Sequence, residues 1–157
     1  MSFFDRLFRK IKPQISCPRC LGKGQVDWED IKRLNQELKW RPGPCAYCAG
    51  SGEVDSEIES KVSVDEPYLT SELSAEERQK LIDNESEAVK KAQLYDAQME
   101  NLIKQIAYLH FTGKLNSETI ADFYLLPMLE TAHQHEAYLE EKEELVNYIN
   151  KVIEKKK

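Results

Sequence analysis

The sequence lacks the features that place a chain in a membrane or on a secretory route. Its longest unbroken apolar run is only a few residues, so no segment is long enough to cross a bilayer as a helix. Residues 1–12 contain neither a long apolar stretch nor a small-residue cleavage site, which argues against a secretory signal. The formal net charge is −6, whereas proteins that bind nucleic acid are usually basic overall. We therefore expect a soluble, cytoplasmic protein, and the charge disfavours nucleic acid as its partner.

Sequence motifs of the common enzyme classes are also missing. The chain has no phosphate-binding glycine loop, no G-x-S-x-G, no H-E-x-x-H and no dinucleotide-binding fingerprint. One E-x-x-H spacing occurs at Glu130 and His133, but a di-iron site in a helical bundle requires two such motifs. We therefore predict that the protein is not an enzyme and has no catalytic residues. Thiol–disulfide exchange is the remaining enzymatic alternative, because C-x-x-C thiols can be activated.

The chain has only four cysteines, and all of them occur in two C-x-x-C pairs. Cys17 and Cys20 form the first pair, and Cys45 and Cys48 form the second. Each pair can place two thiolates on one side of a metal ion, and two pairs complete a tetrahedral shell of four sulfurs. The pattern predicts one structural Zn²⁺, with a rubredoxin-like iron site as the alternative. Four protein ligands leave no open coordination position, which disfavours catalysis by the metal.

Glycine is scarce, and four of the six glycines follow the cysteine pairs at equivalent positions. Gly22 and Gly24 follow the first pair, and Gly50 and Gly52 follow the second. Because the chain must fold back tightly over the sulfur after each pair, residues that tolerate a positive φ are favoured there. We expect backbone N–H groups in these turns to donate hydrogen bonds to the thiolates and to stabilise their charge.

The repeated C-x-x-C-x-G-x-G motif resembles the repeat of the cysteine-rich domain of DnaJ-type co-chaperones, over residues 17–52 only. In that family four copies build two zinc sites. Two copies imply a half-size module with one site, similar to that of anti-TRAP-type inhibitors. The resemblance implies a module that binds another protein, as an adaptor or chaperone-like factor or as a regulator that sequesters a single partner. No His-Pro-Asp sequence occurs, so the J-domain route to stimulating a heat-shock ATPase is not supported.

The insert between the two cysteine pairs predicts a helix over residues 27–40. Asp27 is suited to be its N-cap, and the Arg-Pro-Gly-Pro sequence after residue 40 ends the pattern. Because tryptophan is enriched at the centres of protein interfaces, the apolar stripe of this helix is a candidate partner-binding surface. The alternative is that the helix buries its stripe within the same chain. The stripe consists of Trp28, Ile31, Leu34, Leu38 and Trp40.

Residues 2–12 have the pattern of a short basic amphipathic helix. Such a helix can lie in a membrane interface, with aromatic side chains in the lipid and cations at anionic headgroups. The alternative is that it packs on the rest of the chain or on a partner protein. The candidate contact residues are Phe3, Phe4, Leu7 and Phe8.

Together these features predict a mainly α fold that carries a small irregular or β zinc module. We expect an amphipathic N-terminal helix over residues 1–12 and a DnaJ-like zinc module over 13–54. A connector over 55–73 leads to an acidic helical hairpin or bundle over 74–157.

Helix boundaries in the C-terminal part are marked by capping and breaking residues. Ser74 followed by Glu77 matches a capping box. Gly113 is well placed to end a later helix in a left-handed cap. A new helix is expected to begin at residue 116 or 117, and Pro127 should interrupt it.

Overall fold

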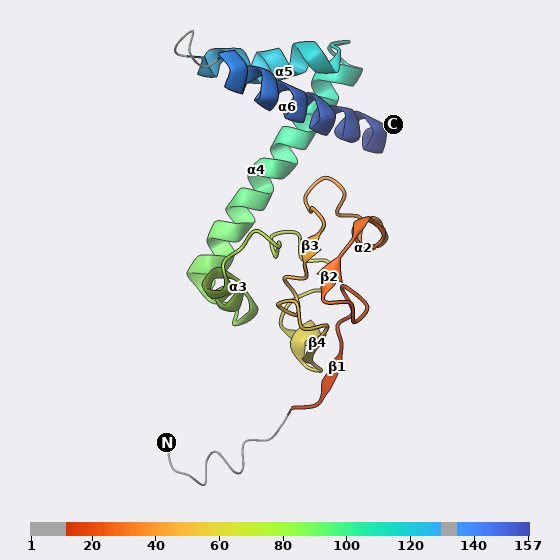
Figure 1. The fold of residues 1–157 in the computed structure, drawn as a ribbon. Coiled ribbons are helices and arrows are strands. Elements are labelled where there is room, and N and C mark those ends of the chain that lie inside the picture. Colours follow the sequence, from red (N-terminus) through yellow and green to blue (C-terminus); the bar gives the residue numbers. More distant parts are fainter. Residues whose placement is uncertain (1–11, 130–134) are drawn as a thin grey trace. The chain divides into compact units, whose positions relative to one another are not determined.

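The computed structural model describes residues 12–129 and 135–157 (Figure 1). The chain divides into two compact units between Leu94 and Tyr95, which we call the first unit and the second unit. Most of the regular secondary structure in the described residues is helical, which confirms the predicted mainly α class. The predicted N-terminal helix, with its four candidate contact residues, falls almost entirely outside the described residues.

The first unit contains short strands and helices, whereas the second unit is helical. The first unit holds β1 (Gln14–Ser16), β2 (Gln25–Val26), α2 (Trp28–Arg33), β3 (Gly43–Pro44), β4 (Glu53–Asp55), the 3-10 helix η1 (Ile58–Ser60) and α3 (Ala75–Ile82). The long helix α4 (Ser86–Phe111) begins in the first unit and ends in the second. The second unit also holds α5 (Ser117–Leu125), the 3-10 helix η2 (Leu126–Met128) and α6 (His135–Lys156). No helix in the described ranges is both long enough and apolar enough to span a bilayer.

Two small antiparallel sheets flank the segments that carry the cysteines. We call residues 17–24 the first cysteine loop and residues 45–52 the second cysteine loop. β1 and β2 flank the first loop, and β3 and β4 flank the second. β1 pairs with β4, with Ile15 opposite Val54, and β2 pairs with β3. Because each sheet joins one side of the first loop to one side of the second, the two loops are held together.

The helix after the first cysteine loop is shorter than the predicted range of 27–40. α2 begins at a capping box in which Asp27 accepts from the backbone N–H of Asp30 and its own N–H donates to the Asp30 side chain. It ends at Arg33, because Asn35 has a φ of 55° and the N–H of Gln36 bonds back to the carbonyl of Ile31. Asparagine tolerates this left-handed conformation, which closes the last turn of a helix.

Residues 55–73 pack into the first unit, whereas the sequence predicted a connector. Ile58, Val62 and Leu69 are buried in the same core as the four cysteines. The backbone of this segment is also fixed, because Val62 accepts a hydrogen bond from the hydroxyl of Tyr47 at 2.8 Å. The apolar residues are spaced irregularly among acids and serines, so they show neither the helical nor the strand period that would reveal a buried face.

The helix α3 belongs to the first unit as well, although the sequence placed it in a helical bundle over 74–157. Its capping box is present as predicted, since the side chain of Ser74 accepts from the N–H of Glu77 and that of Glu77 accepts from the N–H of Ser74. Leu81 and Ile82 at the end of the helix are buried in the core of the first unit. The helical bundle therefore starts later than predicted.

Substituting Ser74 with alanine should lower the free energy of unfolding of the first unit by about 1 kcal/mol, the usual effect of losing an N-cap side chain. Urea unfolding followed by tryptophan fluorescence measures this unit, because both tryptophans of the chain lie in it. Ser71→Ala, at an exposed serine outside the capping box, is the matched control and should change stability by less than about 0.5 kcal/mol. Equal effects of the two substitutions would contradict a stabilising role for the cap.

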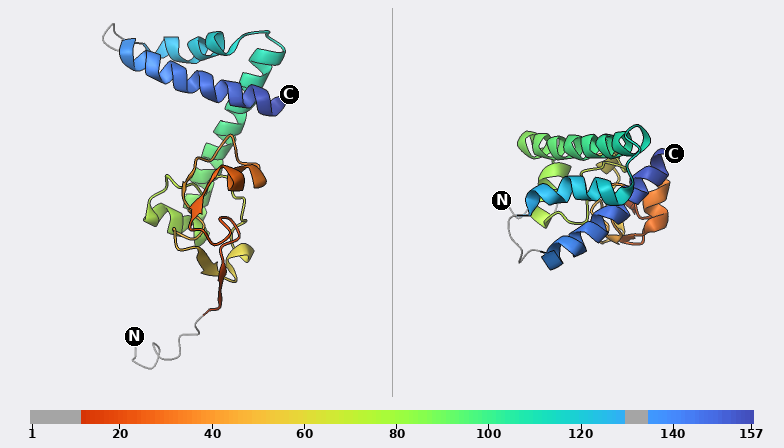
Figure 2. Two further views of the ribbon diagram at one scale, coloured as in Figure 1. Left: turned by 45° about the vertical axis from the view of Figure 1, so that its right-hand side comes forward. Right: turned by 90° about the horizontal axis from the view of Figure 1, so that it is seen from above.

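The second unit has buried apolar side chains on each of its three main helices. α5 and α6 pack against each other, as both views of Figure 2 show. The hydroxyl of Tyr124 on α5 donates to the side chain of Gln105 on α4 at 3.1 Å, which joins these two helices at their surface. The buried residues are Ile103, Ile106, Ile120, Ala121, Ile149, Val152 and Ile153.

Two predicted helix ends in the second unit have different outcomes. The break at Pro127 is confirmed, because α5 ends at Leu125 and is followed by the short η2. The left-handed residue after α4 is Lys114, with a φ of 58°, whereas a left-handed Gly113 was predicted. A Cβ on Gly113 would lie 2.6 Å from the carbonyl oxygen of Leu109, so glycine is required here by close approach of the backbone.

Candidate metal centre

The four cysteines lie together in the interior of the first unit. All four are buried, and their sulfur atoms lie within 4.8 Å of one another. The Sγ atoms of Cys17 and Cys45 are 3.8 Å apart, as are those of Cys20 and Cys48. A disulfide would place two sulfurs about 2.05 Å apart, so the four thiols are free.

These separations fit a tetrahedral shell of four sulfur ligands. A Zn–S bond is about 2.3 Å long, and the edge of a regular tetrahedron with this radius is about 3.8 Å. Two of the four sulfur pairs that link the loops, Cys17–Cys45 and Cys20–Cys48, have this separation. The cluster can therefore hold one metal ion, with two ligands from each loop.

The two cysteine loops have the same local structure. In the first loop the N–H of Gly22 donates to the carbonyl of Cys17 at 3.2 Å. In the second the N–H of Gly50 donates to that of Cys45 at 3.1 Å. The residue after the second cysteine of each pair has a positive φ, and so do both glycines of each loop. The repeated sequence motif thus folds into a repeated turn that presents two sulfurs on one side.

Backbone N–H groups donate hydrogen bonds to the sulfur atoms of Cys20 and Cys48, as the sequence predicts. The N–H of Gly24 lies 3.2 Å from Sγ of Cys20, and the N–H of Gly52 lies 3.3 Å from Sγ of Cys48. Such donors stabilise thiolate charge and orient the ligand atom. The N–H groups of Gly24 and Gly52 thus stabilise the sulfur atoms without being candidate metal ligands themselves.

The loops are also bonded to each other through their backbones. The N–H of Cys17 donates to the carbonyl of Gly52 at 2.8 Å, and the N–H of Cys45 donates to that of Gly24 at 2.9 Å. The last glycine of each loop therefore fixes the first cysteine of the other. This exchange of hydrogen bonds keeps the two halves of the ligand set in register.

The thiols of Cys17 and Cys45 shift each other's ionisation in opposite directions. The hydrogen bond between the Cys17 and Cys45 thiols lowers the pKa of Cys17 to about 5 and raises that of Cys45. Burial raises the pKa of Cys20. A bound divalent cation stabilises all four thiolates at once, so metal binding releases protons and is favoured by rising pH.

A buried arginine beside the cluster was not identified from the sequence. Arg19 occupies the middle of the first C-x-x-C pair and is 1% exposed. Its guanidinium lies 4.1 Å from the ring centre of Trp40 and 5.2 Å from that of Tyr47. Burial lowers the pKa of Arg19 to about 10, and the neighbouring Cys45 and Cys17 oppose that shift by attraction. A charged residue inside a C-x-x-C pair gives no sequence signal of whether it is buried.

The predicted partner-binding stripe does not form one exposed surface. Ile31 and Trp40 are buried in the core of the first unit, and Leu34 packs partly against it. Leu38 is half-buried, and Trp28 is the exposed member, at 43%. Most of the stripe therefore packs within its own chain, as the alternative interpretation of the sequence predicts. The Glu130–His133 pair lies outside the described residues.

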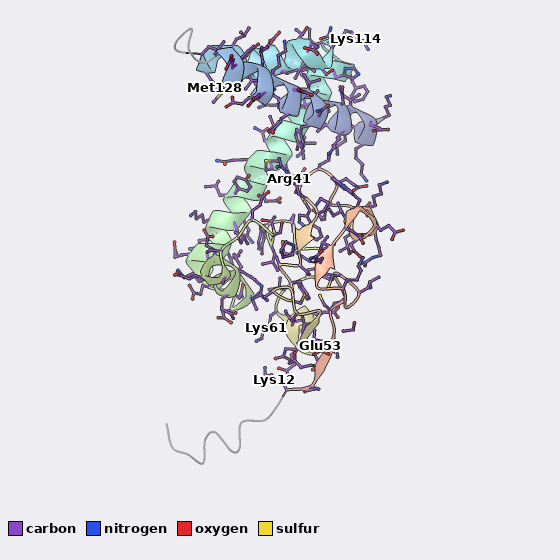
Figure 3. All side chains as sticks on the ribbon, viewed as in Figure 1. Lys12, Arg41, Glu53, Lys61, Lys114 and Met128 are labelled. Carbon is purple, nitrogen blue, oxygen red and sulfur yellow. The ribbon has the colours of Figure 1, made fainter. Side chains whose placement is uncertain are left out.

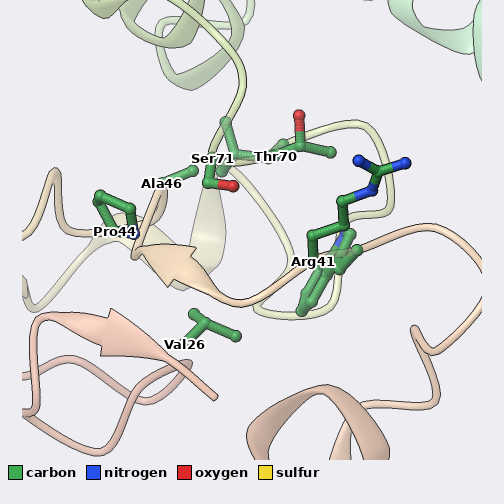
Figure 4. A pocket seen from close by; sticks show the side chains of 8 residues that line it. Val26, Arg41, Pro44, Ala46, Thr70 and Ser71 are labelled. Atoms are coloured by element: carbon green, nitrogen blue, oxygen red, sulfur yellow. The ribbon is translucent and has the colours of Figure 1, made fainter. Parts of the chain in front are cut away.

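A shallow hollow on the first unit carries no arrangement for acid–base or nucleophilic chemistry. It lies beside β3, and its lining includes no carboxylate, histidine or cysteine (Figure 4). Arg41, Thr70 and Ser71 are among the residues that line it. Its lining also includes Val26, Pro44, Ala46 and Leu69.

Comparison with known proteins does not assign the chain to a family. No family model, no curated protein and no solved structure matches the chain. The likeness to the DnaJ-type module therefore rests on the cysteine and glycine motif, and the four-cysteine cluster is the feature from which function is inferred.

Proposed function

We propose that the chain is a non-enzymatic zinc-binding protein that acts as an adaptor or chaperone-like factor for another protein. The first unit would then be a DnaJ-like zinc module, held by one structural Zn²⁺ at Cys17, Cys20, Cys45 and Cys48. The observation that carries this proposal is the buried cluster of four sulfurs, which all lie within 4.8 Å of one another and include two pairs 3.8 Å apart.

The donor set supports a structural role for the metal. Four thiolates suit Zn²⁺, and an all-sulfur tetrahedral shell suits an iron centre as the alternative. Four protein ligands complete the shell, so a substrate or water has no position on the metal. The cysteines are at most 5% exposed, which also disfavours a thiol–disulfide enzyme, because attack on a disulfide requires an accessible thiolate. Free thiols in this number favour a reducing compartment, and we place the protein in the cytoplasm.

Exposed apolar side chains support binding to another protein. In the second unit Phe123 is 60% exposed, Tyr108 is 64% and Met128 is 72% (Figure 3 labels Met128). In the first unit Trp28 is exposed at 43%. Large exposed apolar side chains of this kind contribute much of the binding free energy at protein–protein interfaces. We therefore propose that the partner is a protein, which affinity capture can identify.

Affinity capture with matched baits tests the proposal. The full chain, loaded with Zn²⁺, should retain at least one protein in a fixed ratio, and the Cys45→Ser chain should lose it because its first unit lacks a ligand. Leu21→Ser, at an exposed residue of the first cysteine loop, is the control bait and should retain the same protein. Identical captures by all three baits would contradict an adaptor role for the metal module.

Two activity assays separate the forms of this function. Suppression of aggregation of several unrelated unfolded proteins indicates the chaperone-like form. One retained partner without such suppression indicates a regulator that sequesters that partner. Accelerated reduction of insulin by the zinc-loaded chain would overturn the non-enzymatic assignment in favour of thiol–disulfide exchange.

A further inference from the structure

An arginine in the first cysteine loop ties that loop to the segment that follows the second loop. Arg19 lies between Cys17 and Cys20, and its guanidinium is turned away from solvent. It donates hydrogen bonds to the backbone carbonyl oxygens of Val64 at 2.8 Å, Leu69 at 2.5 Å and Glu66 at 3.3 Å. The middle of the first C-x-x-C pair thus holds residues 64–69 in place.

A second arginine makes the corresponding connection to the second cysteine loop. Arg78 on α3 donates to the carbonyl oxygen of Ala46, and to that of Tyr47 at 3.0 Å. These are the two residues between the cysteines of the second pair. The hydroxyl of Tyr47 donates in turn to the carbonyl of Val62. Both C-x-x-C pairs are therefore bonded, through their central residues, to residues 62–78.

The charges of the two arginines complement those of a loaded centre. Four thiolates around a divalent cation leave two negative charges, and the guanidiniums of Arg19 and Arg78 supply two positive charges. Arg19 is buried and Arg78 is half-buried. A buried cation is costly unless a nearby negative charge compensates for its lost hydration, because neutral carbonyl partners satisfy its hydrogen bonds but not its charge.

We propose that a metal ion at the four cysteines is a latch that holds residues 62–82 on the cysteine loops through Arg19 and Arg78. This inference rests on the metal site proposed above. While the ion is bound, it fixes both loops and its thiolates balance the arginine charges. When the ion leaves, the loops lose their common anchor and the guanidiniums lose their counter-charge, so residues 62–82 detach and the first unit unfolds. All of these contacts lie within the first unit.

Trp40 reports directly on the state of the latch. Its ring is 5% exposed and lies against the guanidinium of Arg19. Its indole N–H donates to the carbonyl of Pro67, inside the segment that would detach, at 3.0 Å. Trp28→Phe leaves Trp40 as the sole tryptophan of the chain. Release of residues 62–82 should expose Trp40 to water and shift its emission to longer wavelength.

The test removes the ion from the full chain and follows Trp40 emission and amide hydrogen exchange. With Zn²⁺ bound, the amides of residues 62–82 should be protected. After chelation we expect a red shift of Trp40 and faster exchange across residues 62–82, both reversed when Zn²⁺ is restored. Amides of residues 103–106 and 149–153 in the second unit provide the internal standard and should be unaffected.

Two variants of α3 separate the latch from the metal site itself. Arg78→Gln should still bind one Zn²⁺, because it retains all four cysteines, but residues 75–82 should exchange about tenfold faster with the ion bound. Lys80→Gln, which removes an exposed cation paired with Glu76, should leave this exchange within about twofold of the wild type.

The outcomes distinguish failure of the latch from failure of the metal site. A chain that holds no metal overturns both. If the chain holds Zn²⁺ and chelation leaves exchange in residues 62–82 unchanged, the site stands and the latch is wrong. Equal exchange in Arg78→Gln and Lys80→Gln also overturns the latch, as does release of residues 149–153 together with residues 62–82.

Discussion

Replacing Cys20 and Cys48 with serine is expected to abolish metal binding and to unfold the first unit, while the second unit stays helical. The substitution removes one ligand from each cysteine loop, and the two remaining sulfurs cannot close a tetrahedral shell. Binding of structural zinc to small domains contributes about 10–16 kcal/mol at neutral pH, whereas a typical domain is stable by about 5–15 kcal/mol. The loss therefore exceeds what the apolar core of the first unit can offset.

Three measurements on the full chain test this expectation. Metal analysis should give one Zn²⁺ per wild-type chain and less than a tenth of that for the double serine variant. Tryptophan fluorescence should lose its cooperative urea transition, since Trp40 is buried in the same core as the four cysteines. Far-UV circular dichroism should keep most of its helical signal, because the core of the second unit lies in other helices.

Leu21→Ser is the matched control for the double variant. It introduces the same side chain next to Cys20, at a residue that is 62% exposed, and it leaves every sulfur in place. It should bind one Zn²⁺ and keep the wild-type urea midpoint. A full complement of zinc in the double serine variant, or an unchanged transition without zinc, would show that the four cysteines are not a structural metal site.

Local signals explain which parts of this fold were predictable. The capping box at Ser74 and the break at Pro127 depend only on neighbouring residues, and both are present in the structure. The turns of the cysteine loops are also predictable from neighbouring residues, because the C-x-x-C spacing alone brings the two sulfurs of each pair to one side of their loop. The prediction that the two loops pair follows from the four sulfur ligands that a tetrahedral metal site would require.

Tertiary packing explains which parts were not predictable. Ile58, Val62 and Leu69 have no period in sequence, so nothing marks them as part of a core. Arg19 is buried through carbonyl partners that lie some 45 to 50 residues later. The burial of most of the predicted partner-binding stripe was not predictable for the same reason, since periodicity predicts an apolar face but not whether that face is covered. Ile31 is fully buried by residues that the pattern could not place.

Alanine at Gly24 is expected to be far more damaging than alanine at Gly50, although both glycines have a φ near +80°. The left-handed conformation costs about 1–2 kcal/mol for a residue with a Cβ, and this cost applies to both positions. At Gly24 the new Cβ would also lie 2.4 Å from the backbone carbonyl oxygen of Gly50. At Gly50 the nearest atom to a new Cβ would be the carbonyl oxygen of Gly24, at an ordinary 3.8 Å.

The clash at Gly24 cannot relax without moving the cysteines of both loops. Its own N–H donates to Sγ of Cys20, and its carbonyl accepts from the N–H of Cys45, so a shift of this residue disturbs both loops. We therefore expect Gly24→Ala to lower the free energy of unfolding of the first unit by more than about 3 kcal/mol and to weaken zinc affinity about 10- to 100-fold. Gly50→Ala should cost about 1–2 kcal/mol and keep the metal.

Gly52→Ala and Gly22→Ala extend the comparison. A Cβ on Gly52 would lie 2.4 Å from the carbonyl oxygen of Gly22, so this variant should resemble Gly24→Ala. A Cβ on Gly22 would meet the hydroxyl of Ser16 at 2.6 Å, and that side chain can rotate away, so an intermediate loss is expected. Urea unfolding and competitive zinc titration of the four variants measure this order. If all four lose the same stability, backbone conformation alone determines the requirement for glycine, and the close approach of the two loops plays no part in it.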